Sequence, residues 1–139
     1  MPANIALPDR VANLESVIFG GPNTNGGPLV AADTLTHYVG STDALTYAGT
    51  AIIDATGVDA CTLATPVVGQ DDGKKLRIIS TTAHAHTITT AANKIANGAT
   101  TAFGDTLTFA AKQGANCLLM AVQGIWYLLE ATNVTLSEV

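Results

Sequence analysis

The segment Cys117–Leu129 is the feature that most constrains the fold of this chain. It consists of two apolar stretches that meet at Gln123-Gly124. Glycine accepts the positive φ angle that a tight hairpin turn requires, and the flanking aliphatic, β-branched and aromatic residues favour a pleated, half-buried surface. The segment therefore predicts an antiparallel β-hairpin. Trp126 and Tyr127 point to opposite faces of its second strand, and we expect Trp126 to lie in the core.

Short strands separated by turns continue through most of the chain. Period-two patterns and turn residues predict further strands near residues 35–39, 44–48, 51–54, 60–64, 67–68, 75–80, 86–89, 105–110 and 133–137. Many short strands at this spacing are typical of β-sandwiches and barrels. We therefore expect an all-β domain over residues 34–139, built as an antiparallel β-sandwich, a jelly-roll-like fold or a small barrel.

Residues 1–33 differ from the rest of the chain and predict an extended N-terminal arm. Behind Pro8-Asp9, the apolar residues at helical spacing are Val11, Leu14, Val17 and Ile18. They predict one short amphipathic helix, which is too short to be stable alone and must dock on something larger. A run of glycine, proline and asparagine over residues 20–28 then interrupts any regular structure. The arm is either an attachment segment for a partner or a strap over its own domain.

The composition favours a protein that works inside an assembly. A chain of 139 residues forms one domain with an arm. Apolar residues make up 47% of it and charged residues only 12%, which is about half of the charged fraction of ordinary soluble domains. Because charge is depleted at the cores of protein interfaces, we expect an oligomer rather than a free monomer.

The same composition argues against two classes of partner. A net charge of −5 with scattered basic residues does not suit nucleic acid, whose binders cluster lysine and arginine. No stretch has the length of a membrane span, and the first ten residues lack the pattern of a signal peptide, so we expect synthesis in a cytoplasm. In such a reducing compartment, Cys61 and Cys117 are expected to be small buried hydrophobes rather than a disulfide.

His84 and His86 are the only pair in the sequence with the spacing of metal ligands. On a strand, two residues apart, they would project from one face, and a closed site would need further ligands from His37, a carboxylate or a neighbouring subunit. Two histidines without an adjacent cysteine or carboxylate are a weak signal. We therefore expect no metal and no other cofactor, and interpret the pair as part of a polar strand face or a packed interface.

No catalytic motif stands out elsewhere. Gly69–Lys75 superficially resembles a phosphate-binding loop, but the glycine spacing is wrong and no helix is expected to follow, so a hairpin turn explains it better. The sequence has no Gly-x-Ser-x-Gly elbow, and its aspartates fall mostly beside turns, where they cap backbone amides. We therefore expect a protein that is not an enzyme.

Several segments resemble a β-rich domain of tailed-bacteriophage virion proteins, the trimeric head-decoration or cement proteins. The resemblance covers about residues 50–136 and rests on Leu63–Pro66, Asp71–Leu76, Ala85–Thr89, Leu107–Phe109, Gly114-Ala115 and Gly124–Leu129. These segments are structural turns and strands. Similar modules occur in head fibres and in tail fibres or spikes.

The resemblance implies a homotrimer on the capsid surface of a virion that clamps adjacent major capsid proteins. In that reading, Val11, Leu14, Val17 and Ile18 of the arm are the candidate capsid-binding residues. The alternative is a receptor-binding module of a tail fibre, spike or head fibre. A third hypothesis, a metal-dependent hydrolase that uses His84 and His86, would require a bound metal.

Overall fold

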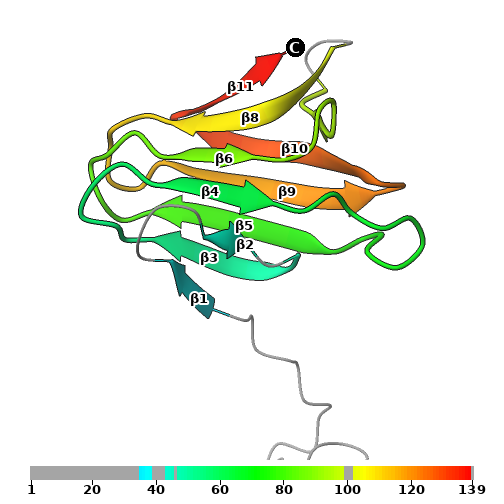
Figure 1. Ribbon diagram of the computed structural model, residues 1–139, viewed down its shortest axis with the longest axis horizontal. Helices are drawn as coiled ribbons and strands as arrows, with labels where there is room; N and C mark the ends of the chain where they lie inside the picture. Colours follow the sequence, from blue (N-terminus) through cyan, green and yellow to red (C-terminus); the bar gives the residue numbers. More distant parts are fainter. Residues whose placement is uncertain (1–34, 39–42, 46, 99–101, 139) are drawn as a thin grey trace, which may run out of the picture. The chain divides into compact units, whose positions relative to one another are not determined.

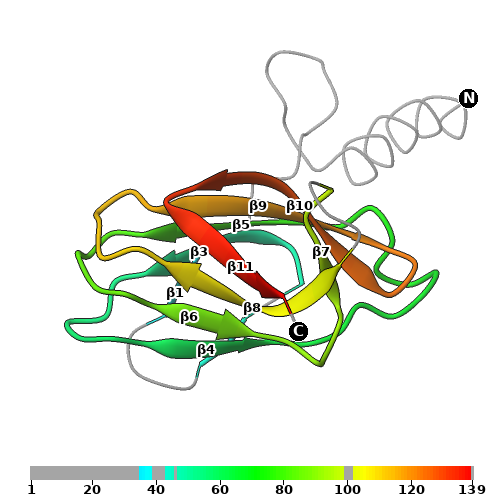
Figure 2. The same cartoon turned by 90° about the horizontal axis from the view of Figure 1, so that it is seen from above.

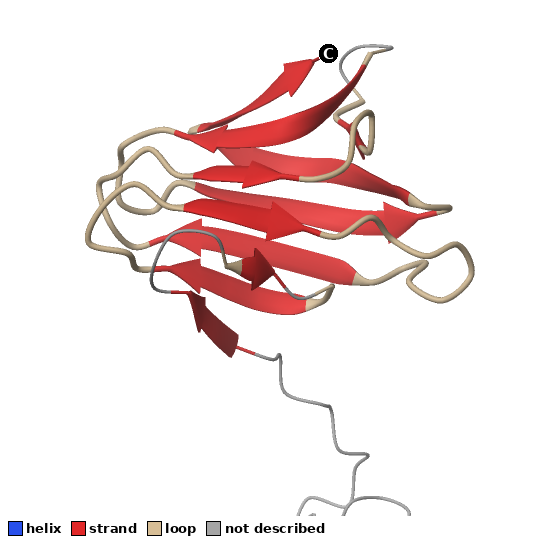
Figure 3. Ribbon diagram, in the orientation of Figure 1, coloured by secondary structure: helices blue, strands red, loops and turns tan. Residues whose placement is uncertain are grey.

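The computed structural model describes residues 35–38, 43–45, 47–98 and 102–138 of the chain. The arm, with its predicted helix, lies outside these residues. The described strands belong to one compact unit, Asp33–Val139. Every regular element in them is a β-strand, which confirms the prediction of an all-β domain (Figure 3).

Eleven strands form one continuous sheet in the described part of the chain (Figure 1). The strands are β1 (Leu35–Tyr38), β2 (Ala44–Leu45), β3 (Gly49–Ile53), β4 (Ala60–Leu63), β5 (Lys75–Ser80), β6 (Thr87–Thr89), β7 (Ile95–Ala96), β8 (Phe103–Phe109), β9 (Asn116–Val122), β10 (Ile125–Thr132) and β11 (Val134–Glu138). Their order in the sheet is β1-β3-β5-β9-β10-β7-β8-β6-β4-β2, and β11, which lies off this path, pairs with β8.

The sheet folds over on itself into two facing walls (Figure 2). The β9 wall contains β1, β3, β5, β9 and β10, and the β8 wall contains β2, β4, β6, β8 and β11. The short strand β7 joins the walls, because it pairs with β10 on one side and with β8 on the other. The result is a nearly closed, barrel-like sheet, so of the three predicted architectures the small barrel describes it best.

The prediction of an antiparallel sheet is wrong for half of the described strand pairs. The parallel pairs are β1–β3, β3–β5, β2–β4, β4–β6 and β7–β10. The physical reason lies in the path of the chain, which alternates between the walls from β1 to β6. Strands that neighbour one another within a wall are therefore separated by a crossover through the other wall, and they run in the same direction.

The predicted hairpin is confirmed as β9 and β10. Ile125 pairs with Val122, and the two turn residues, Gln123 and Gly124, have φ angles of 49° and 79°. Two consecutive positive φ angles define the turn whose twist matches a right-handed hairpin. Further along β10 the register shifts between Leu128 and Glu130, which leaves Leu129 as an extra residue in a β-bulge.

The segment between β4 and β5 differs from the prediction of a strand and hairpin at residues 67–68. Val67 and Val68 lie in an exposed loop, and β4 pairs with β2 and β6 rather than with β5. Two carboxylates stabilise this loop by hydrogen bonds. Asp71 accepts a hydrogen bond from the Val67 amide, and Asp72 accepts one from the Gln123 amide of the β9–β10 turn. Strand β7 is not among the predicted strands, because its two residues are too few to show a periodicity.

Trp126 anchors the core, as predicted. Its side chain is fully buried, its indole Nε1–H donates a hydrogen bond of 3.0 Å to the Ala64 carbonyl, and its ring stacks on Tyr47 at a centroid distance of 6.3 Å. The side chains that alternate inward from both walls complete the core, among them Ile53, Ile78 and Phe109. The two cysteines are buried and free, which also agrees with the prediction.

The packing of β11 on β8 generates a testable prediction. A Cβ atom at Gly104 would collide with the Ser137 carbonyl oxygen and approach the Leu136 side chain to 2.7 Å. We expect Gly104→Ala to displace β11 and lower the free energy of unfolding by about 1–3 kcal/mol in urea denaturation.

Gly57→Ala is the matched control, because a Cβ atom at Gly57 meets nothing within 4 Å. Equal stabilities of the two variants would contradict the close contact between β8 and β11.

Candidate assembly surface

The predicted metal candidates, His84 and His86, lie in the loop between β5 and β6 rather than on a strand. Their rings are 6.2 Å apart, edge to face. His86 is fully buried and both of its ring nitrogens are engaged: Nδ1 accepts a hydrogen bond of 3.1 Å from the Asp59 amide, and Nε2 lies 3.0 Å from the Thr82 hydroxyl. Because Nδ1 is the acceptor, Nε2–H is the donor to Thr82.

The hydrogen bonds of His86 link the loop before β6 to the loop before β4, and the groups in this cluster are poorly suited to catalysis. The Asp59 carboxylate accepts hydrogen bonds from the Ala60 amide and the Cys61 thiol. Burial, together with this hydrogen bond to Asp59, raises the pKa of the Cys61 thiol to about 12, so the thiol stays protonated and a poor nucleophile at neutral pH. Among the described residues, no group of three or more His, Cys, Asp or Glu side chains is placed to hold a metal ion.

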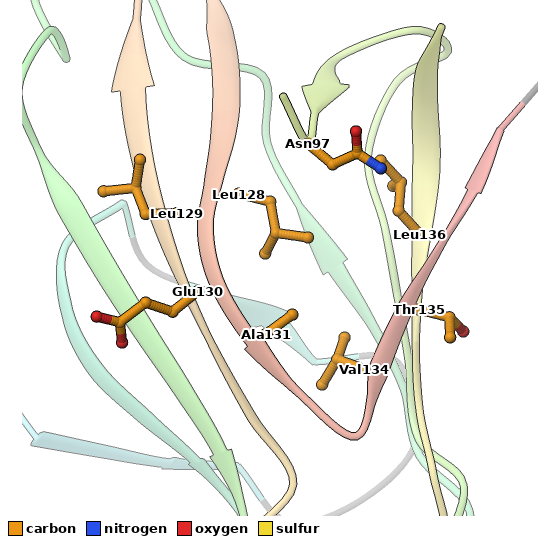
Figure 4. Close-up of a pocket in the computed structure, with 8 residues that line it drawn as sticks. All are labelled: Asn97, Leu128, Leu129, Glu130, Ala131, Val134, Thr135 and Leu136. Carbon is orange, nitrogen blue, oxygen red and sulfur yellow. The ribbon is translucent and has the colours of Figure 1, made fainter. Parts of the chain in front are cut away.

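A groove lies between β10 and β11, which diverge from the tight turn at Asn133 (Figure 4). Its volume is about 410 Å³ and its lining consists of Asn97, Leu128, Leu129, Glu130, Ala131, Val134, Thr135 and Leu136. These lining residues include no histidine or cysteine, and their single carboxylate, Glu130, is paired with Arg77. The groove is therefore of mixed polarity, and its lining holds no acid–base pair.

The outward side of β3, β5, β9 and β10, which we call the β9 face, is the unusual surface of this molecule. In β9, Cys117, Leu119 and Ala121 point into the core, so the alternate residues point outward. The outward apolar side chains of the β9 face are Ile52, Ile79, Leu118, Met120, Val122, Ile125 and Tyr127, with Leu129 at the bulge. Tyr127 is 39% exposed and Leu129 is 46% exposed, whereas the other six side chains are only partly exposed.

The strand register brings these side chains together. Met120 stands opposite Lys75 on one side and Tyr127 on the other, and Leu118 stands opposite Arg77 and Glu130. The Arg77 guanidinium reaches across β9 to the Glu130 carboxylate at 3.1 Å, so one ion pair spans the Leu118 position. Both charged side chains remain well exposed, and such a pair contributes little to stability by itself.

Strand β9 is therefore apolar on both faces, whereas the described part of the chain buries only one of them. Strands with continuous apolar runs are typical of sheets that are covered on both sides. An exposed apolar patch that charged residues border marks a surface for another protein. The run Cys117–Val122 carried this signal in the sequence, but sequence reasoning used it only to predict a strand.

The predicted capsid-binding residues Val11, Leu14, Val17 and Ile18 lie outside the described residues, so their role stays a prediction. No protein-family model matches the chain, and no curated protein was found to be similar to it. In the described part there is also no helix long and apolar enough to cross a membrane. The geometry of the β9 face is thus the main guide to function.

The buried histidine predicts a pH-dependent stability. Burial lowers the pKa of His86 below its usual 6.5. At pH values between the folded and unfolded pKa, the unfolded chain binds a proton that the folded chain does not, so the contribution of His86 to stability is full above pH 6.5 and is lost as the pH falls. We expect the free energy of unfolding to decrease between about pH 7.5 and about pH 5.5 in urea titrations monitored by Trp126 fluorescence.

His86→Gln should lower stability at neutral pH by about 1–3 kcal/mol, since it breaks the buried hydrogen bonds, and should flatten this pH dependence. His84→Gln is the control. If the free energy of unfolding of His86→Gln changes with pH as steeply as that of the unaltered protein, groups other than His86 cause the pH dependence.

Proposed function

We propose that this chain is a non-enzymatic structural protein of a virion, a homotrimer that decorates and stabilises a bacteriophage capsid. It would bind across the junctions of major capsid proteins, on the outside of the shell. The observation that carries the proposal is the β9 face, an apolar surface that the described part of the chain covers only in part. The resemblance of residues 50–136 to head-decoration proteins supplies the biological setting.

Burial of surface is sufficient for this function. A cement protein that binds only the assembled shell stabilises that shell by its binding free energy, which the dissociated subunits do not receive. A trimer engages three equivalent sites at once, so modest single contacts add up to high avidity without any reactive group. The low charge of the chain suits a protein whose surfaces are largely occupied by neighbours.

The chemistry of the described residues supports a non-enzymatic role. The buried cluster of Asp59, Cys61 and His86 has its polar atoms engaged in hydrogen bonds within the fold. Burial also raises the pKa of Cys117, on the inner side of β9, to about 12. Neither cysteine supplies the thiolate that nucleophilic catalysis requires.

The arm provides the attachment in this proposal. Val11, Leu14, Val17 and Ile18 would form the apolar side of its helix and contact the capsid.

The direct test is to mix the purified full chain with undecorated capsids and to locate the added density by electron microscopy. We expect three-lobed density on the outer capsid surface, at junctions between capsid proteins. Density on the tail alone would contradict a decoration role and favour the alternative, a receptor-binding module of a fibre or spike.

Charged substitutions in the arm refine this test. The variant L14E should lose most of its capsid binding, because a carboxylate within an apolar contact opposes burial. Unchanged binding by L14E would move the attachment surface from the arm to the β-domain.

A further inference from the structure

We propose that the groove between β10 and β11 receives an extended segment of a partner protein, which adds a strand to the sheet and covers the core there. The inference rests on the proposed function for the identity of the partner, which in a decoration role is the major capsid protein. The juxtaposition that carries it is a pair of strand edges that flank inward side chains without full cover: Leu128 and Ala131 on β10, and Leu136 on β11.

The inner side of β10 becomes uncovered along the strand. Three residues of β9 point into the core and are fully buried: Ala121, Leu119 and Cys117. Their cross-strand partners on β10 are, in the same order, Trp126, Leu128 and Ala131, and cross-strand partners share a face of the sheet. Trp126 is fully buried, Leu128 is only partly buried and Ala131 is exposed. Because Cys117 is buried beside the exposed Ala131, the cover is missing on the other side of β10, where the groove lies.

Strand β11 shows the same feature at the other rim of the groove. Leu136 stands opposite Leu107 of β8, which is fully buried, yet Leu136 itself is only partly buried. Both Leu128 and Leu136 pack against the core, so the groove opens onto it. Figure 4 shows Leu128 projecting into the space between the two strands.

The two rims of the groove are strand edges. Beyond Tyr127, which pairs with β7, the described strands pair with β10 only through β9, so its other edge faces the groove. Among the same strands, β11 pairs only with β8, so its second edge is also open. An open edge presents backbone N–H and C=O groups in a row and is a template for an added strand.

These properties commit the groove to an extended polypeptide rather than a small apolar ligand. Because the lining is of mixed polarity, an occupant must supply hydrogen-bonding groups and apolar surface together. An extended strand supplies both, since its backbone pairs with an edge while alternate side chains point inward. The only charged residue of the lining, Glu130, is already paired with Arg77, so we expect the inward side chains of the added strand to be uncharged and apolar.

The size of the groove sets the strength of the contact. One added strand of about five residues buries less than the roughly 800 Å² per partner of a stable interface. The groove therefore acts together with a second contact, the proposed contact of the arm. Two linked contacts raise the overall affinity well above that of either alone.

The first test uses the full chain and needs no capsid. The probe is the capped peptide Thr-Val-Thr-Val-Thr, whose valines share one face when the peptide is extended, and the control peptide has glycine in place of each valine. In NMR titrations at millimolar peptide, we expect the valine peptide alone to shift the backbone amides of residues 128–136. Absence of these shifts would overturn the inference.

The second test blocks the groove. Ala131→Arg places a long charged side chain there at an exposed position, where substitutions have little effect on stability. We expect this variant to lose the peptide-induced shifts and to bind undecorated capsids about tenfold more weakly than the unaltered chain. Ala60→Arg, at an exposed alanine on β4, is the matched control and should bind as the unaltered chain does. Far-UV circular dichroism and Trp126 emission report whether each variant is folded.

The outcomes separate this inference from the proposed function. A folded Ala131→Arg that binds capsids as tightly as the unaltered chain overturns the inference, but the decoration role stands. An unaltered chain that binds no capsid removes the decoration role, and the shifts with the valine peptide then support the groove as a strand-binding site or, if absent, overturn it. Slow hydrogen exchange of the groove amides in the unbound chain would show that this chain or a second copy already fills the groove, which also overturns the inference.

Discussion

The two-sided apolar character of β9 is the constraint on which the rest of the structure depends. Its inner side chains, Cys117, Leu119 and Ala121, pack into the barrel core beside Trp126. Its outer side chains, Leu118 and Met120, gain nothing from that core. A strand of this kind is stable in the fold because one face is covered, and it favours association because the other is not. In the proposed decoration role, stability and association would both depend on this one strand.

The path of the chain explains how this strand reaches the centre of its wall. From β1 to β6 the chain alternates between the two walls, so β1, β3 and β5 stack in parallel in one wall while β2, β4 and β6 stack in the other. The hairpin β9–β10 then adds antiparallel to β5 and completes the β9 wall. At the loops between the walls, the buried side chains of Asp59 and His86 accept hydrogen bonds from the Ala60 and Asp59 amides and so stabilise the connections.

Much of the fold was predictable from local chemistry, and the remainder was not, for definable reasons. The hairpin at Gln123-Gly124, the buried Trp126 and most strand positions follow from turn residues and side-chain alternation. Strand direction does not follow from these signals, because side chains alternate between the two faces in the same way in parallel and antiparallel sheets. The Val67-Val68 error has a similar origin, since two β-branched residues fit either a strand or an exposed loop. The β9 face could not be predicted in this way, because only the register of four strands brings residues 52, 79, 118 and 127 onto one surface.

Hydroxyl-radical footprinting of the unaltered full chain tests the central claim most directly: that the β9 face is covered in the native protein. Modification rates of Met120 and Tyr127 are compared with the rate at Val68, which is 67% exposed on a loop, and each is normalised to the rate in urea. We predict strong protection of Tyr127 and Met120 relative to Val68. Reaction of Tyr127 at the rate that its 39% exposure in the single subunit allows would contradict the account.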